Sequence, residues 1–193
     1  MLRLDNLSKR YGDYLVFQGL THRFTPGCVA LREEDSTGES TLLNIIAGAI
    51  TPDSGDVWID GHSLTHAPDN CLAFLTQTGR GLLEQVAAEK NVARDEATLE
   101  LAYDLRLEPH LNKRFEQMST GTRRKVFVTA AALGDPAVVI ADGPSNGFDA
   151  RGRAVLAELF KAWGKDRVVL FASHDGELVE GCGAEVMDVG ALR

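Results

Sequence analysis

Three short, almost wholly apolar segments set the strongest limit on how this chain can fold. They are GCVALR (27–32), PAVVIAD (136–142) and the apolar run in DRVVLFASH (166–174). Short apolar runs bounded by turns are typical of buried strands. Segments with helical spacing follow them, among them STLLNIIAGAI from Ser40 and DARGRAVLAELFKAWG (149–164). This alternation of strands and helices with short connections predicts an α/β fold with a mostly parallel sheet covered by helices.

The remaining segments add a second kind of sheet and a helical insert. Residues 2–7, 14–20, 56–60 and 184–189 are expected to form strands, and the first two alternate as in a partly exposed sheet. CLAFLTQ (71–77) is expected to be a further buried strand. The charged stretch from about 80 to 118 repeats Ala97, Leu101 and Leu105 at four-residue spacing, which predicts amphipathic helices. A helix capped by Ser119 follows. We expect a single domain, residues 1–193, with a helical insert at about 80–135.

Composition excludes several classes of protein. The formal net charge of −8 argues against a nucleic-acid-binding surface, which is normally basic. The apolar runs fall short of the roughly 18 residues needed to span a bilayer, and the N-terminal segment does not resemble a signal peptide. Three widely spaced cysteines without a CxxC pair do not suggest a disulfide or zinc framework. These features predict a cytoplasmic chain that contacts a membrane only through a partner.

The loop LREEDSTGESTLL (31–43) has the outline of a phosphate-binding loop but an acidic composition. A strand, a turn and a helix beginning with Ser40 and Thr41 can aim backbone N–H groups at a phosphate. Such a loop needs an early glycine and a lysine before the serine, yet Glu33 and Glu39 stand at those positions, whereas Gly38, Ser40 and Thr41 match. On its own, the segment fits a solvated acidic turn better. It also lacks the alternating oxygen ligands of a calcium loop, which weakens a divalent-cation site.

Other segments favour the phosphate-loop interpretation. PAVVIAD ends in Asp142, as does a strand that delivers a carboxylate to Mg²⁺ beside a phosphate loop. It is followed by GPSNGFD and preceded by MSTGTRRK, and SHD follows the last long strand. By order and spacing, six such segments over essentially the whole chain resemble the ATP-binding subunits of ABC transporters. The resemblance implies a P-loop NTPase-like nucleotide-binding domain with an antiparallel β edge and a helical insert.

The resemblance also implies roles for individual residues. Tyr11 matches the aromatic that stacks on adenine, residues 33–41 the Walker A loop, and Gln77 the glutamine that senses the γ-phosphate and the transmembrane partner. Ser119, Thr120 and Gly121 match the signature that closes over ATP held by the opposite subunit. The remaining matches are the Walker B aspartate (Asp142), the D-loop aspartate at the dimer interface (Asp149) and the switch histidine (His174). Ser40 and Asp142 would hold Mg²⁺ if nucleotide binds. Taken singly, Tyr11, Gln77 and His174 would be unremarkable.

The departures from the family pattern concern this chain's own nucleotide. Glu39 replaces the Walker A lysine, and Gly143 stands where the family has its catalytic glutamate. Two like charges 4 Å apart repel by about 4 kcal/mol at an effective dielectric near 20, and each 1.4 kcal/mol is about a tenfold change in affinity. ATP and Mg²⁺ are therefore doubtful in this pocket. Without a carboxylate at residue 143, bound ATP would lack the group that activates water.

Three hypotheses follow from the sequence. In the leading one, the chain is a degenerate, non-hydrolytic subunit that pairs with an active ABC ATPase in a heterodimer, shares that partner's ATP and Mg²⁺, and serves a membrane permease. In the second it is a pseudo-ATPase scaffold of a membrane complex without ATP. In the third it is still an active ATPase working as a homodimer. The short chain resembles compact subunits of bacterial exporters such as the haem exporter of cytochrome c maturation.

Overall fold

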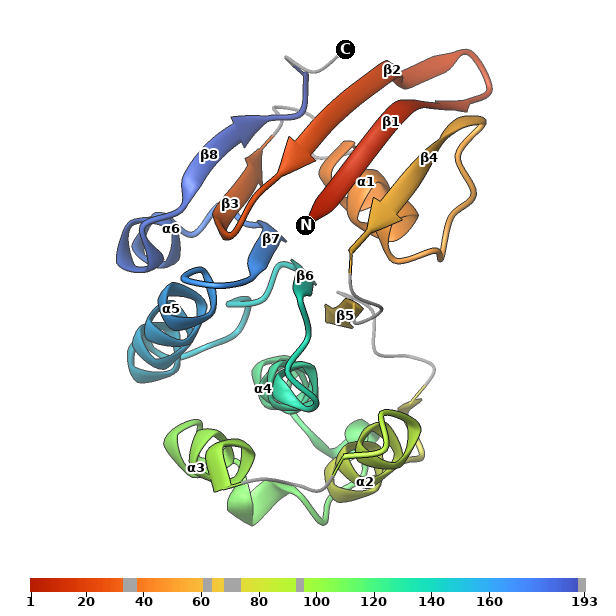
Figure 1. Cartoon of the computed structure of the whole chain (residues 1–193). Coiled ribbons are helices and arrows are strands. Elements are labelled where there is room, and N and C mark those ends of the chain that lie inside the picture. Colours follow the sequence, from red (N-terminus) through yellow and green to blue (C-terminus); the bar gives the residue numbers. More distant parts are fainter. Residues whose placement is uncertain (33–37, 61–63, 68–73, 93–95, 191–193) are drawn as a thin grey trace.

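A five-stranded parallel sheet forms the centre of the computed structural model, which describes residues 1–32, 38–60, 64–67, 74–92 and 96–190 (Figure 1). Its strands run in the order β5-β6-β7-β3-β8, and every pairing among them is parallel. They are β3 (Gly27–Arg32), β5 (Leu64–Ala67), β6 (Val138–Asp142), β7 (Val168–Ala172) and β8 (Glu185–Asp188). The predicted α/β fold with a parallel sheet is confirmed.

A three-stranded antiparallel sheet lies along one side of the parallel sheet (Figure 1). It pairs β1 (Leu2–Tyr11) with β2 (Tyr14–Phe24) and with β4 (Ser54–Ile59). The hairpin between β1 and β2 turns at Gly12, whose φ of 58° suits a residue without a side chain. Both strands are longer than predicted, because the pairing of β1 with β2 extends from Leu2 opposite Phe24 to Tyr11 opposite Tyr14. The antiparallel β edge is therefore present.

Helices cover the parallel sheet on both faces. α1 (Gly38–Ile46) packs on β6 and β7, whereas α5 (Ala150–Trp163) packs on β3 and β7 and α4 (Thr120–Ala132) on β5. α6 (Gly176–Cys182) packs on α5. α2 (Gly79–Glu89) and α3 (Glu96–Asp104) lie beyond α4, on the side away from β1, β2 and β4 (Figure 1). Short 3₁₀ helices at Glu108–His110 and Phe115–Gln117 lead into α4.

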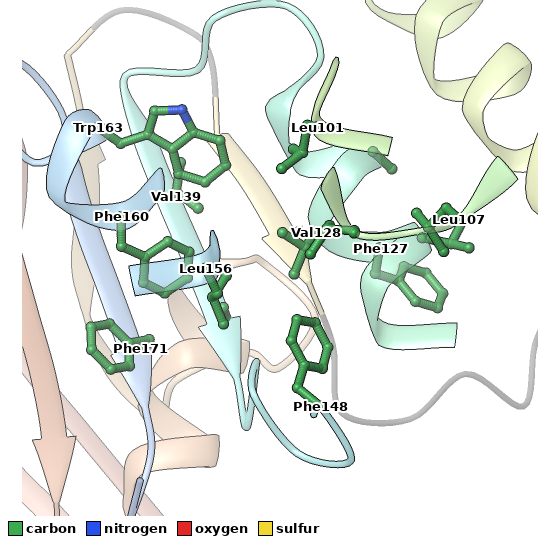
Figure 2. Packing of buried hydrophobic residues seen from close by; sticks show 14 of the residues in the cluster. Leu101, Leu107, Phe127, Val128, Val139, Phe148, Leu156, Phe160, Trp163 and Phe171 are labelled. Atoms are coloured by element: carbon green, nitrogen blue, oxygen red, sulfur yellow. The ribbon is translucent and has the colours of Figure 1, made fainter. Parts of the chain in front are cut away.

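Two apolar cores hold the sheet, one on each face. One includes Leu4, Phe17, Leu42 and Ile140, between the parallel sheet, α1 and the antiparallel sheet. The other lies among the parallel sheet, α4 and α5, where Phe160 stacks near Trp163 and Phe171 (Figure 2). Fully burying one such side chain contributes about 1.5–3 kcal/mol. The frame of the molecule therefore depends on buried apolar residues on both sides of the sheet.

The strand predicted at 71–77 is wrong for the residues that the structure describes. Residues 74–77 form a turn, residues 71–73 lie outside the described part, and the strand beside β6 is Leu64–Ala67. Phe74 instead joins an aromatic cluster between helices, 6.3 Å from the Phe115 ring and 5.4 Å from the Phe127 ring. The apolar character of the segment serves helix packing, which periodicity alone does not distinguish from a buried strand.

Among the helices that the structure describes, we find none long and apolar enough to cross a membrane. Cys28 and Cys182 are buried free thiols. Cys71 lies outside the described residues.

Candidate functional site

A pocket of about 320 Å³ opens where β6 and β7 end and α1 begins. Because parallel strands end at the same edge of the sheet, this edge gathers the residues that follow them. The pocket is lined by Glu39, Ser40, Asp142, Gly143, Asn146, Ala172, Ser173, His174 and Asp175. It therefore brings together five residues that the sequence predicts as parts of one site: Glu39, Ser40, Asp142, Gly143 and His174.

The start of α1 supplies the phosphate-loop side of this pocket. α1 begins at Gly38, and the side chains of Glu39 and Thr41 are buried, with 3% and 5% exposed. Ser40 is half-buried and lines the pocket. Residues 33–37, which include Glu33, lie outside the described part, so the predictions for the loop itself have no structural counterpart here.

Acidic residues contribute much of the pocket lining. Glu39, Asp142 and Asp175 line it, and the Asp175 carboxylate lies 3.9 Å from Arg153 Nε. A buried glutamate stands at residue 39, where a phosphate loop needs a lysine. Among the described residues, no group of three or more His, Cys, Asp or Glu side chains is placed to hold a metal ion. At residue 39 the lining therefore departs from the pattern of an intact phosphate loop.

Arg124 contacts the backbone of two residues that line the pocket. Its side chain is 6% exposed, and Nη1 donates hydrogen bonds to the carbonyl oxygens of Asp142, at 2.9 Å, and Gly143, at 2.7 Å. Burial lowers the pKa of Arg124, and the charge of Asp142 opposes that shift. The guanidinium fixes the backbone after β6 and does not line the pocket.

The predicted signature residues lie at the start of α4, outside the pocket. Ser119 caps α4 by accepting a hydrogen bond from the Thr122 backbone N–H at 3.2 Å. Ser119 and Thr120 are exposed, whereas Gly121 is buried, with its backbone against the carbonyl oxygen of Gly147. A side chain at residue 121 would overlap that carbonyl. The signature segment thus presents polar groups outward on a tightly packed backbone.

Asp149 stands beside the signature segment and caps α5. Its carboxylate accepts hydrogen bonds from Lys125 Nζ at 3.2 Å and from the Gly152 backbone N–H at 3.1 Å. The bond from Lys125 is the main cause, and that from Gly152 a further one, of a lowered pKa for Asp149. Lys125 lies on α4, so this bond joins Asp149 to the helix that the signature residues begin.

Tyr11 and Gln77, like the signature residues, do not line the pocket. Tyr11 is 46% exposed at the end of β1, with Lys9 Nζ 5.4 Å from its ring centre. Gln77 donates from Nε2 to Gln85 Oε1 at 2.9 Å, and its backbone carbonyl accepts from the Phe115 N–H. The roles that the resemblance implies for them stay predictions.

Sequence reasoning missed three side chains that matter at this site. Asn146 and Asp175 line the pocket, and Arg124 donates a hydrogen bond to the backbone carbonyl oxygen of Asp142. Their positions offered a signal, because Asn146 lies in the turn directly after Asp142 and Asp175 follows His174. Arg124 gave none, since an arginine in a helix is most often exposed.

Sequence comparison finds relatives of this chain among known proteins. The family model described as ABC transporter matches residues 27–146. The sulfate/thiosulfate import ATP-binding protein CysA of Gloeobacter violaceus is 30% identical over 90% of this chain, which spans only 55% of that protein. The cell division ATP-binding protein FtsE of Escherichia coli is 30% identical over 93% of this chain and 90% of its own length.

Solved structures share the fold. A dimeric bacterial ABC transporter cassette superposes with a TM-score of 0.80 at 19% identity, covering 98% of this chain and 95% of its own. The same type of cassette in a post-hydrolysis state, bound to ADP and Pi, gives 0.77 at 20% identity over 97% and 94%. An ATP-binding subunit of an ABC transporter gives 0.79 at 24% identity, over 93% and 82%.

Proposed function

The chain belongs to the ABC transporter ATP-binding cassette family, and from that premise we propose that it is a degenerate subunit whose own pocket does not hydrolyse ATP. It pairs with an active ATPase subunit and a membrane permease to support transport. The observation that carries the proposal is the buried Glu39 carboxylate in a pocket that also holds Asp142 and Gly143. Glu39 stands in place of the lysine, and Gly143 in place of the glutamate, on which the chemistry of the family depends.

The energetics support this reading of the pocket. Exchanging a lysine for Glu39 removes an attraction and adds a repulsion, each on the order of 4 kcal/mol for charges 4 Å apart at an effective dielectric near 20. Even half of one such interaction weakens binding more than tenfold. Gly143 offers no group to orient or deprotonate water, which typically contributes 10²–10⁴-fold to a rate. Hydrolysis in this pocket is therefore strongly disfavoured.

The signature surface supports pairing with an active subunit. The exposed residues Ser119 and Thr120 begin α4, a helix of 13 residues whose N-terminus carries a partial positive charge. Asp149 stands beside them on the same surface. These residues can complete a site on a partner that holds its own ATP and Mg²⁺. One of the similar solved structures is described as dimeric and bound to ADP and Pi, which supports a paired arrangement.

Purification from the native cells tests the proposed assembly. The chain is isolated in mild detergent, and the proteins that accompany it are identified by mass spectrometry. We expect a permease together with a second ABC subunit that has the lysine and glutamate missing here. A permease without any active ATPase would contradict the proposed pair and favour a scaffold that works without ATP.

Reconstitution with that partner tests the role of the signature surface. We expect the mixture to hydrolyse ATP faster than either chain alone, and Ser119→Arg to abolish the gain, because a large cation would occupy the surface offered to the partner. Ser54→Arg is the matched control, since Ser54 is exposed on β4 and its side chain makes no hydrogen bond among the described contacts. A gain that survives Ser119→Arg would rule out this use of the surface.

A second candidate function is a still-active ATPase that works as a homodimer. The convergence of Ser40, Asp142 and His174 on one pocket favours it, as does the similarity to FtsE, which is described as an ATP-binding protein. In that case, ATP hydrolysis by the purified chain would be measurable and would disappear in Asp142→Asn.

The proposed permease partner determines where in the cell the assembly lies. We place the chain on the inner face of the cell membrane, held there by the permease, and the resemblance to compact haem-exporter subunits suggests an export system. Residues 1–193 act as one domain in which the helical insert at about 80–135 contributes the signature. Subunits that stay soluble after detergent-free lysis and high-speed centrifugation, in cells that contain the permease, would contradict this location.

A further inference from the structure

The backbone at residue 143 cannot readily accept a side chain. Gly143 has a φ of 53°, in the left-handed region that side chains disfavour. A Cβ at this position would lie 2.5 Å from Asn146 Nδ2 and 3.4 Å from Arg124 Nη1. The first distance is far inside van der Waals contact. The backbone conformation therefore disfavours a side chain at the position that the resemblance assigns to a catalytic carboxylate, and in this structure the end of the exposed Asn146 side chain occupies the space beside it.

The surrounding contacts hold this backbone in place. The Gly143 N–H donates to the Ala172 carbonyl oxygen at 3.0 Å, and the Gly143 carbonyl oxygen accepts from the Asn146 N–H at 3.1 Å. Arg124 Nη1 donates to the carbonyl oxygens of two successive peptide groups, those of Asp142 and Gly143. Further along the turn, Gly147 packs against the backbone of Gly121. Moving residue 143 would disturb the end of β6, the turn and the start of α4 together.

Asn146 faces the pocket from this turn. It is exposed, it lines the pocket with Asp142 and His174, and no hydrogen bond to its side-chain amide is found among the described residues. A neutral amide can donate to a phosphate oxygen or to water and can accept a hydrogen bond. Unlike a carboxylate, it cannot take a proton from water near neutral pH.

We propose that Asn146 stands in for the side chain missing at residue 143: its amide occupies the space that a catalytic carboxylate there would need, and it is a group that cannot act as a base. The inference rests on the proposed function and deepens it. It implies that restoring the glutamate alone does not restore catalysis, because the restored side chain meets Asn146. Removing Asn146 opens the position.

The steric part is tested on the isolated chain by thermal unfolding of Gly143→Ala, Asn146→Ala and the double variant. We expect Gly143→Ala to lower Tm by roughly 5 °C, from strain and overlap, and to cost clearly less when Asn146 is already alanine. Gly176→Ala is the control, because a Cβ there meets nothing within 4 Å. Additive changes in Tm would overturn the proposal, since they would show that the two side chains do not compete for space.

The chemical part is tested with Mg-ATP in a Glu39→Lys background, which removes the opposing charge. Glu39→Lys/Gly143→Glu is compared with the same pair plus Asn146→Ala. We expect the triple variant to hydrolyse ATP at least tenfold faster, toward the lower end of what a positioned base contributes. Equal rates in the two variants would overturn the proposal. The Tm measurements on the single and double variants need neither ATP nor a partner. Their result would therefore stand if the proposed pairing failed, and that failure would be detected by the separate purification and reconstitution experiments.

Discussion

The pocket at the end of β6 and the signature surface at the start of α4 differ in the charges that they present. The pocket is lined by three acidic residues, Glu39, Asp142 and Asp175, of which Glu39 is buried. On the signature surface, Ser119 caps α4, and Asp149 caps α5 and pairs with Lys125. Both regions rest on the same apolar cores, which lie on the two faces of the sheet and do not depend on these charges.

The two regions are nevertheless joined. Arg124 belongs to α4 yet holds the carbonyl oxygens of Asp142 and Gly143, and the backbones of Gly121 and Gly147 pack together. A chain that lost only ATP hydrolysis in its own pocket would retain these contacts between α4 and the turn after β6, because the contacts shape the surface offered to a partner. Substitutions in each region should therefore differ in their effects on stability and on nucleotide binding.

Gly121→Ala has the largest expected effect. Its Cβ would overlap the Gly147 carbonyl oxygen, which belongs to a backbone fixed on both sides. Overpacking of this kind costs about 1–3 kcal/mol and occasionally more, and we expect the upper end. Gly176→Ala, with open space around it, serves as the control. Chemical denaturation measures both, and equal stabilities would show that the contacts between α4 and the turn after β6 tolerate movement.

Arg124→Leu tests the buried link between the two regions. It removes charged hydrogen bonds to two carbonyl oxygens, each worth about 1.5–3 kcal/mol, but it also removes the desolvation cost of a buried cation. We expect a net loss of about 2 kcal/mol in the free energy of unfolding. Arg151→Leu, at an exposed site in the first turn of α5, should be close to neutral. A neutral Arg124→Leu would mean that packing alone holds α4 against the turn after β6.

Glu39→Gln sharpens the claim about charge in the pocket. The side chain keeps its size but loses the negative charge that opposes phosphate. We expect the affinity for a fluorescent ATP analogue with Mg²⁺ to rise about tenfold, equivalent to about 1.4 kcal/mol. Glu180→Gln, exposed on α6, should leave binding unchanged. If both variants bind as weakly as the parent chain, the charge at residue 39 is not what limits nucleotide binding.

Ser119→Ala measures the capping of the signature helix. It removes the hydroxyl that accepts from the Thr122 N–H, and losing such a cap costs about 1 kcal/mol. In a domain of this size, we expect Tm to fall by about 2–4 °C. Ser54→Ala, on the exposed face of β4, should change Tm less. An unchanged Tm in Ser119→Ala would show that water replaces the cap.

The smallest expected effect is the pH dependence of Asp149. Its pKa is lowered in the folded state, so the stabilisation is present above the pKa of the unfolded chain, about 3.9. It is lost as the pH falls through the folded pKa. Because the side chain is 56% exposed, the contribution is small. We expect Asp149→Asn to lower Tm by about 1–2 °C at pH 7, and the difference to shrink towards pH 3. A difference that is independent of pH would exclude the ion pair.

Much of the frame could be predicted, because its signals are local. GCVALR became β3 with the predicted bounds, PAVVIAD yielded β6 ending at Asp142, and Ser119 and Asp149 cap the helices expected of them. Apolar runs and capping residues are read within a few positions of sequence. The meeting of Ser40, Asp142 and His174 in one pocket followed from the resemblance and from the rule that parallel strands end at one edge.

The parts that could not be predicted depend on contacts distant in sequence. β5 lies at 64–67 because that segment pairs with β6 and meets α4, whereas Phe74 packs with Phe115 and Phe127. The burial of Arg124 depends on carbonyl groups 18 and 19 residues away. The closure of residue 143 by Asn146 depends on a left-handed backbone and a rotamer, which composition does not reveal.

The most direct test of the central claim is ATP hydrolysis by the purified chain itself, at high protein concentration with millimolar Mg-ATP, beside Asp142→Asn. The account predicts no hydrolysis by the parent chain above the rate of Asp142→Asn, even at concentrations that favour dimers. Hydrolysis that is clearly faster and is lost in Asp142→Asn would contradict it, because the pocket with Glu39 and Gly143 would then be a working active site.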